Sequence, residues 1–275
     1  MKRIGYISLA VLAICTVLGA GVAQASPAIN GAILYPRWFN DCAVTTLTPT
    51  NLYPGLIRID ESFLVCTGGA NMHPWDLSAD GGGTSAVFNN KDAFSLGAVL
   101  RLEHPTGNVG QEGGLRVCPW WDQKANGYFN VRLPDGEIAC FGGVLPFFTF
   151  TGAFGLHYLA GTDIHIQVIY DPHCNTANDP GTIEYIVDYQ GQHFTSGPLA
   201  FNNCTSGEEI HGCYGIMDDA RVGGRIQQNF GVGGGDPGAQ NIGSFFDVLY
   251  APLAGHDCPV PTQNTTWGRA KATYR

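Results

Sequence analysis

Apolar and polar residues alternate along four segments of this 275-residue chain. These segments are 94–103, 128–133, 164–170 and 183–189. Side chains of a β-strand point alternately to its two faces, so a period of two places one row on a core and the other toward water. The alternation therefore predicts a protein that is built from amphipathic strands.

Seven more segments are candidate strands, and turn-forming sequences separate them. The candidates are 56–60, 63–67, 114–118, 137–141, 146–151, 220–230 and 244–251. Glycine (38 residues) and proline (16 residues) interrupt the chain often, and no segment keeps a helical apolar period over about twelve residues. We expect an all-β fold, an antiparallel two-sheet β-sandwich, in one domain at 26–252 that is followed by a tail at 253–275.

The first 25 residues have the pattern of a secretory signal peptide. Lys2 and Arg3 precede an uncharged, mostly apolar run at 7–22, and Ala23-Gln24-Ala25 matches the small-x-small sequence that signal peptidases cleave. The sequence thus predicts a secreted protein, either periplasmic or extracellular. No later stretch of about 20 residues is apolar, so no membrane span is expected after cleavage.

The acidic balance of the chain restricts its partners. The formal net charge of −9 becomes two units more negative when Lys2 and Arg3 leave with the signal peptide. Nucleic acids and anionic membrane surfaces repel such a chain, so neither is expected as a partner.

Eight cysteines follow the signal peptide, and an even number in an exported chain predicts four disulfides. A zinc cage is the alternative, but the chain has no Cys-x-x-Cys pair. Pairing of sequence neighbours predicts Cys42–Cys66, Cys118–Cys140, Cys174–Cys204 and Cys213–Cys258. The last of these bonds would tether the tail.

Two of the alternating segments are joined by a turn in a way that is typical of one fold class. The first reads DIHIQVIYD at 163–171 and carries a histidine, and the second reads IEYIVDYQG at 183–191. This pair resembles the centre of the concanavalin-A-like and laminin-G-like jelly rolls, and 94–103, 114–117 and 127–133 are similar to the strands that precede it. The resemblance implies a jelly-roll sandwich whose ligand is most often carbohydrate, and it implies no activity.

No catalytic motif is recognisable in the sequence. The Glu-x-Asp-x-x-Glu strand of jelly-roll glucanases is missing, and Glu184 and Asp188 would lie about 13 Å apart along one strand, too far for glycosidase chemistry. The Gly-x-Ser-x-Gly elbow, the phosphate-binding loop and His-x-x-x-His are also missing. The sequence therefore favours a protein that is not an enzyme, and no catalytic residue is assigned.

The most suggestive candidate for ligand binding is the pair Trp120-Trp121. Sugar rings pack on exposed indole faces while polar groups hydrogen-bond to their hydroxyls, although the indoles could instead close an edge of the sandwich. Six residues at polar positions of the strands could share a sheet face with an exposed indole, or form an ordinary wet surface. They are Arg116, Arg132, His165, Gln167, Glu184 and Asp188.

A second candidate site lies in the turn after 164–170. Asp171, Asn175, Asn178 and Asp179 gather oxygen atoms there, and oxygen ligands on a loop suit calcium. Asn and Asp are also common in turns that bind no ion, so a turn without calcium is the alternative. The sequence indicates no required cofactor, and it allows a bound calcium ion.

Taken together, the sequence predicts an exported, non-catalytic β-sandwich that binds carbohydrate or another extracellular surface component. Two alternatives stay open. One is a glycoside hydrolase or polysaccharide lyase on the same scaffold, and the other is a structural cell-surface or extracellular protein without a small ligand.

Overall fold

The computed structural model describes residues 26–35, 39–62, 69–106, 110–119, 127–133, 135–202, 212–229, 240–256 and 258. The expected signal peptide, the expected strand at 63–67 and the candidate residues Trp120 and Trp121 lie outside these residues.

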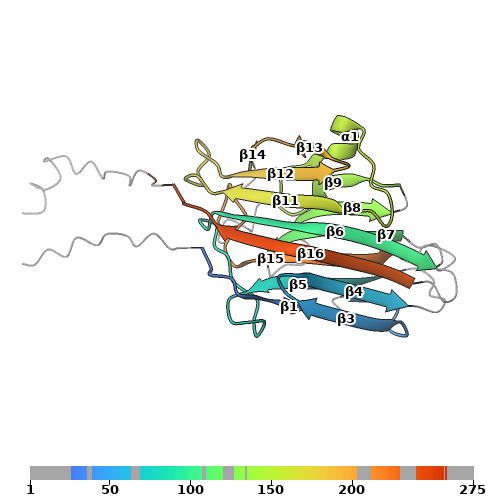
Figure 1. Ribbon diagram of the computed structural model, residues 1–275. Helices are drawn as coiled ribbons and strands as arrows, with labels where there is room; N and C mark the ends of the chain where they lie inside the picture. The colour runs from blue at the N-terminus through green and yellow to red at the C-terminus, as the bar shows by residue number, and fades with distance from the viewer. Residues whose placement is uncertain are drawn as a thin grey trace, which may run out of the picture.

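Two antiparallel sheets, which we call sheet A and sheet B, are stacked face to face, with sheet B in front in Figure 1. Sheet A contains β1 (Gly31–Leu34), β2 (Phe39–Asn40), β5 (Ala70–Ser78), β7 (Gly110–Pro119), β8 (Gly127–Leu133), β9 (Ile138–Phe141), β10 (Phe148–Thr149) and β15 (Ala220–Asn229). Sheet B contains β3 (Thr46–Leu52), β4 (Leu56–Ser62), β6 (Phe94–Thr106), β11 (Ile164–Asp171), β12 (Thr182–Tyr189), β13 (Gln192–Thr195), β14 (Leu199–Ala200) and β16 (Gln240–Pro252). The expected antiparallel two-sheet sandwich is confirmed.

The order of strands in each sheet differs from their order in the chain. Sheet A runs β1-β5-β15-β7-β8-β9-β10, with β2 also paired to β5. Sheet B runs β13-β12-β11-β6-β16-β4-β3, with β14 also paired to β12. The chain thus crosses repeatedly between the sheets, so strands that are close in sequence often lie in different layers.

The alternation of the sequence is reproduced by burial in the sheets. Along β11 the residues are buried and half-buried in strict turn, from Ile164 to Asp171, and β12 shows the same period. The buried rows meet the other sheet in one hydrophobic core, where Trp75 of sheet A packs edge-on against Phe245 of sheet B at 5.2 Å. The complementary row is left on the outer face of each sheet.

One group of side chains that point into the space between the sheets is polar. Glu61 on β4 accepts hydrogen bonds from Thr45 and Asn71, at 2.6 and 2.7 Å, and its other oxygen lies 2.9 Å from His73. Glu61, Asn71 and His73 are completely buried. These hydrogen bonds join β4 of sheet B to β5 of sheet A, so a polar network replaces apolar packing here.

Two local expectations are corrected by the structure. The strand expected at 146–151 is only the two-residue β10, because α1 (Phe150–Phe154) begins directly after it. Thr149 accepts a hydrogen bond from the amide of Gly152, and Gly155 ends the helix in the left-handed conformation. Strand β5 is not among the expected strands, and it contains Pro74, a residue that usually argues against a paired strand.

The disulfide pattern differs from the one expected. Cys174 is bonded to Cys258, so the expected pairs Cys174–Cys204 and Cys213–Cys258 are wrong. Cys213 and Cys42 also take part in disulfides. Cys66 lies outside the described residues, so the pair Cys42–Cys66 stays a prediction.

Cys140 is a buried free thiol, which makes the expected Cys118–Cys140 bond wrong. The reason is the strand order, because β8 lies between β7, which carries Cys118, and β9, which carries Cys140. Two strand spacings amount to about 9.6 Å. The Cα atoms of a disulfide lie within about 7 Å of each other.

Among the described residues, no helix combines the length and the hydropathy that a membrane crossing requires.

Candidate functional site

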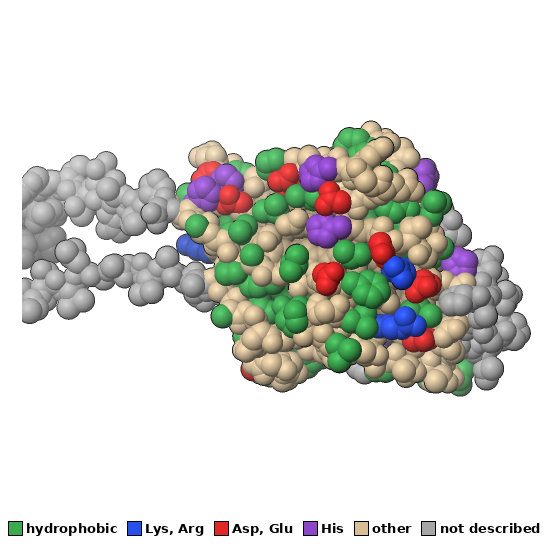
Figure 2. Space-filling view, in the orientation of Figure 1, with side chains coloured by type: hydrophobic (Ala, Val, Ile, Leu, Met, Phe, Trp, Pro, Cys, Tyr) green, Lys and Arg blue, Asp and Glu red, His purple; other side chains and the backbone are tan. Residues whose placement is uncertain are grey.

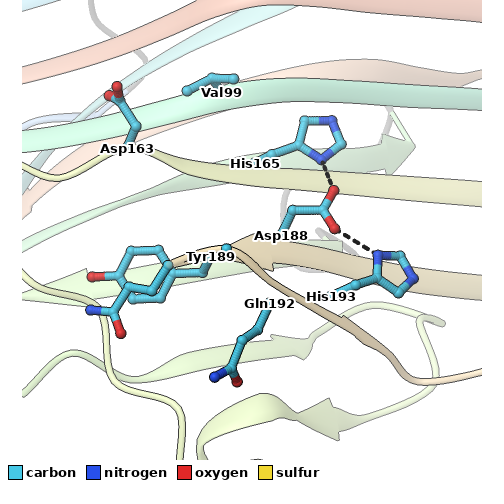
Figure 3. Close-up of a pocket in the computed structure, with 9 residues that line it drawn as sticks. Val99, Asp163, His165, Asp188, Tyr189, Gln192 and His193 are labelled. Carbon is cyan, nitrogen blue, oxygen red and sulfur yellow. Dashed lines mark hydrogen bonds and ion pairs between the residues drawn. The ribbon is translucent and has the colours of Figure 1, made fainter.

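A shallow depression of about 500 Å³ lies on the outer face of sheet B. Strand β6 contributes Val99, β11 and the residues before it contribute Asp163 and His165, and the β12–β13 hairpin contributes the remainder, including Asp188 and His193. Figure 3 shows this region, and Figure 2 shows histidine and acidic side chains gathered over β11 and β12.

Asp188 lies at the centre of the depression and joins two histidines. Its Oδ2 atom lies 3.0 Å from Nδ1 of His165, and its Oδ1 atom lies 2.6 Å from Nδ1 of His193. The register explains the arrangement, because Asp188 on β12 stands directly opposite His165 on β11 and directly opposite His193 on β13. Directly opposed residues of neighbouring strands project on the same face, so the three side chains form a row across the sheet.

The carboxylate determines which ring nitrogen of each histidine is available. A carboxylate only accepts hydrogen bonds, so the Nδ1 atom of each ring carries the proton and donates a hydrogen bond to Asp188. In a neutral imidazole the Nε2 atom then keeps its lone pair, and Figure 3 shows the second nitrogen of both rings directed away from Asp188. The row therefore presents two hydrogen-bond acceptors in fixed positions.

Solvent reaches all three residues of this row. The side chains of His165, Asp188 and His193 are 27%, 47% and 63% exposed. The ring of His165 lies over Gly97 on β6, where a Cβ atom would come within 3.0 Å of Nε2. The absence of a side chain at Gly97 thus makes room for the imidazole.

The β12–β13 hairpin adds side-chain amides to the depression. Gln190 and Gly191 form its two-residue turn, both at positive φ, and Gln192 begins the next strand. The ring of Tyr189, the residue before this turn, is buried. Its hydroxyl accepts a hydrogen bond from the backbone amide of Leu159. Gln190 and Gln192 are exposed, and each amide group can both donate and accept hydrogen bonds.

Asp163 forms the rim of the depression and is already paired. Its two carboxylate oxygens accept hydrogen bonds from Nε and Nη2 of Arg101, each at 2.7 Å. The guanidinium of Arg101 also lies over the ring of Phe246, 5.4 Å from its centre. Asp163 is therefore paired with a cation, whereas Asp188 is hydrogen-bonded to the imidazoles of His165 and His193.

The six polar candidates from the sequence do not share one face, and that expectation is wrong. His165 and Gln167 on β11 and Glu184 and Asp188 on β12 lie on the outer face of sheet B, but only His165 and Asp188 line the depression. Glu184 instead accepts a hydrogen bond from the hydroxyl of Thr195. The other two candidates, Arg116 and Arg132, belong to sheet A.

The arginines on the outer face of sheet A are held by acids. Arg116 pairs with Asp76 at 3.1 Å, and both side chains are almost completely buried. Arg132 is more exposed and pairs with Asp135 and with Glu137.

A further arginine that the sequence analysis did not single out belongs to the same face. Arg225 on β15 is 2% exposed, and its Nη2 atom donates to Glu112 at 3.1 Å and to Asn130 at 3.0 Å. Its guanidinium lies 3.9 Å from the centre of the Tyr128 ring. Burial and pairing leave these cations of sheet A unsuited to capturing an anionic ligand.

The residues of the expected calcium site have other partners. Asn175 donates a hydrogen bond at 2.6 Å to the backbone carbonyl of Asn90, and Asn178 is exposed. Asp171 contacts His256 at 2.8 Å, and Asp179 contacts His173 at 3.2 Å. The nearest side-chain partners of the two carboxylates are therefore nitrogen atoms.

No protein-family model matches this chain, and no curated protein matches it. Among solved structures, alginate lyase vAL-1 from Chlorella virus aligns with a TM-score of 0.42 and 10% identity, over 83% of this chain and 93% of the lyase. Lectin II from Ulex europaeus aligns with a TM-score of 0.37 and 6% identity, over 79% of this chain and 99% of the lectin. A protein of unknown function from Shewanella oneidensis MR-1 aligns with a TM-score of 0.39 and 8% identity, over 86% of this chain and 93% of that one.

With TM-scores below 0.5 and identities of 10% or less, these three likenesses carry no argument about this chain. Function therefore has to be inferred from the side chains of this chain.

Proposed function

We propose that this protein is an exported, non-catalytic β-sandwich that binds neutral carbohydrate in the depression around Asp188. The observation that carries the proposal is the row His165–Asp188–His193, in which one carboxylate orients a half-buried and an exposed imidazole. Export is supported by the signal-like N-terminus and by the disulfide Cys174–Cys258, since disulfides persist in oxidising compartments.

The donor and acceptor pattern of the depression suits hydroxyl groups. Each sugar hydroxyl can donate one hydrogen bond and accept others, so it can donate to Nε2 of an imidazole and accept from an amide of Gln190 or Gln192. Val99 supplies a small apolar surface beside these groups. An open depression of this kind suits one or two sugar units of a longer glycan rather than an enclosed small molecule.

The charges around the depression favour a neutral ligand over an acidic one. Asp163 and Asp188 both line the depression, and the chain carries a formal charge of −9. Among the described residues, Arg101 is the arginine beside the depression. It donates hydrogen bonds to both carboxylate oxygens of Asp163. A uronate carboxylate would therefore meet repulsion without a free cation to offset it.

Binding is favoured over hydrolysis because the two carboxylates of the depression are already engaged. A glycosidase needs one acid to protonate the leaving oxygen and a second carboxylate as nucleophile or base. Asp163 is held by Arg101, and Asp188 is shared between His165 and His193. A lyase would instead require groups that neutralise an acidic sugar, and each described arginine of sheet A is paired with an acid. Arg116 pairs with Asp76, Arg225 with Glu112, Arg132 with Asp135 and Glu137, and Arg221 with Asp219.

Glycan-array binding tests the proposal directly. We expect the intact protein to bind neutral glycans in preference to uronate-containing ones, and we expect the double variant H165A/H193A to lose that binding. The matched control is H157A, which removes an exposed histidine that hydrogen-bonds to the backbone of Asp135 away from the depression.

Each other outcome points to a different function. Absence of binding by the wild-type protein would favour the structural, ligand-free alternative. Release of reducing ends or of unsaturated sugars from a bound glycan would establish the enzyme alternative. Binding that survives in H165A/H193A would show that the glycan site lies elsewhere on the protein.

A further inference from the structure

A second cluster of histidine and carboxylate groups lies at the end of β11, outside the depression. Asp171, His173 and His256 each direct one potential ligand atom toward the others, and these atoms all lie within 4.8 Å of one another. In Figure 2 histidine and acidic side chains gather at the end of the molecule from which the chain leaves after β16.

The disulfide between Cys174 and Cys258 brings the two parts of this cluster together. The bond joins residues that are 84 positions apart, and it places His173, directly before Cys174, close to His256, two positions before Cys258. The rings of the two histidines are stacked, with centres 4.8 Å apart and planes inclined by 13°. A covalent cross-link thus holds both imidazoles in position before any ligand binds.

Hydrogen bonds and ion-pair contacts orient the three groups. Oδ1 of Asp171 accepts from the backbone amide of His173 at 3.1 Å, which leaves Oδ2 for His256 at 2.8 Å and for Nε2 of His173 at 3.8 Å. Nδ1 of His173 lies 3.2 Å from Oδ1 of Asp179. A carboxylate that accepts the Nδ1 proton leaves the Nε2 lone pair free to bind a metal, as is common around metal-bound histidines.

We infer that Asp171, His173 and His256 form a binding site for a divalent transition-metal ion, of which Zn²⁺ is the representative. Two imidazoles and one carboxylate are a ligand set that zinc accepts, with water in the fourth position. Ligand atoms around a tetrahedral zinc lie about 3.4 Å apart, given bonds of about 2.1 Å. The two distances from Oδ2 of Asp171, 2.8 and 3.8 Å, lie on either side of this value, so binding requires small side-chain movements and a shift of the His256 proton from Nε2, which faces Asp171, to Nδ1.

The same residues explain why this site suits zinc better than calcium. Calcium takes six to eight oxygen ligands, whereas two of the three converging groups are imidazoles. Asn175, which was expected to supply an oxygen ligand, uses its amide to hold the backbone of Asn90. Bound zinc would join β11 to the segment after β16 beside the disulfide, and it would raise the stability of the folded protein by mass action.

Zinc titration of the untagged, full-length protein by calorimetry tests the inference, at mildly alkaline pH where imidazoles are neutral. We expect one equivalent of Zn²⁺ to bind, a higher Tm in its presence, and a much weaker response to Ca²⁺. The variants D171N and H256Q are expected to bind zinc at least tenfold more weakly and to lose the increase in Tm. D171N keeps the Oδ1 acceptor that the amide of His173 needs, so its fold is expected to survive.

H165Q is the matched control, because it changes a histidine of the depression and leaves this cluster intact. It is expected to bind zinc like the wild-type protein. Co²⁺ provides a second readout, since a site with two imidazoles and a carboxylate should give visible d–d absorption that is lost in H256Q. Failure of the wild-type protein to bind stoichiometric zinc would overturn the inference, and so would equal binding by wild type, D171N and H256Q.

Discussion

His73 and Glu61 contact each other across the space between the two sheets, with Nε2 of the histidine 2.9 Å from Oε2 of the carboxylate and neither side chain exposed. Burial by itself raises the pKa of Glu61, but hydrogen bonds from His73, Thr45 and Asn71 outweigh this effect, and the pKa falls below its usual value. The interior of the sandwich therefore holds a carboxylate in its charged form.

Replacing Glu61 by glutamine is expected to lower the free energy of unfolding by about 3 kcal/mol, because it removes one partner of a buried pair and leaves His73 without its acceptor. Urea denaturation with the disulfides intact measures this change. The matched control is E137Q, where a partly exposed glutamate that pairs with Arg132 is changed, and the expected effect there is below about 0.5 kcal/mol. Equal stabilities of E61Q and E137Q would contradict the structural role of Glu61.

The contribution of Glu61 also depends on pH, and its direction follows from the lowered pKa. A carboxyl group with a lower pKa in the folded state stabilises the protein fully above its ordinary pKa of 4.5, and the stabilisation is lost as pH falls through the folded-state value. The difference in unfolding free energy between wild type and E61Q is thus expected to be constant near neutrality and to shrink on acidification below 4.5. Comparing the two proteins cancels the titrating groups that do not contact residue 61, and a difference that does not change between pH 4.5 and more acidic pH would count against this assignment.

The thiol of Cys140 is expected to be unreactive in the folded protein. It is completely buried in the core, and burial raises its pKa well above the ordinary value, so the reactive thiolate is scarce. Alkylation followed by peptide mass spectrometry should find Cys140 unmodified under native conditions and modified after unfolding without reductant. Recovery of Cys140 in a disulfide-linked peptide would show that the sheet order around β8 is wrong.

A side chain at Gly243 should destabilise the core, because the two sheets approach each other closely there. A Cβ atom at this position would lie 2.1 Å from Cδ1 and 2.3 Å from Cγ1 of the buried Ile226. We expect G243A to lower the unfolding free energy by about 1–3 kcal/mol, the usual cost of overpacking. At Gly55 the nearest atom to a new Cβ is 3.6 Å away, so G55A should leave stability nearly unchanged in the same denaturation experiment.

The strands and their faces were predictable from the sequence, but their assignment to a sheet was not. The alternation at 94–103 and 164–170 predicts β6 and β11, and the buried parity of each strand matches the apolar residues. Alternation shows which residues of a strand point outward, but it does not show to which sheet the strand belongs. Arg116 and His165 were therefore expected on one face, whereas they lie on different sheets. Pairing between strands that are distant in sequence decides the layer, and no local pattern encodes it.

The candidate sites show the same limit. Asp188 and His165 were singled out because they occupy polar positions of alternating strands, whereas His193 lies in a short strand with no alternation and was missed. His173 and His256 are far apart in sequence, and they come together through the pairing of β11 and β16 with the same strand, β6, and through the Cys174–Cys258 bond. Glu61 and His73 occupy core positions that the pattern reserves for apolar residues, so their pairing had no sequence signal.

The most direct test of the account is the affinity of D188N for the neutral glycan that the wild-type protein binds best, measured by calorimetry beside D135N. Asp188 and Asp135 have similarly exposed side chains, 47% and 50%, but Asp135 pairs with Arg132 beside sheet A. An asparagine can accept the Nδ1–H of only one imidazole, so the orientation of His165 or His193 is lost. We predict that D188N binds at least about tenfold more weakly than wild type, a loss of about 1.4 kcal/mol, while D135N binds equally well. Unchanged binding by D188N would contradict the assignment of the carbohydrate site to the row around Asp188.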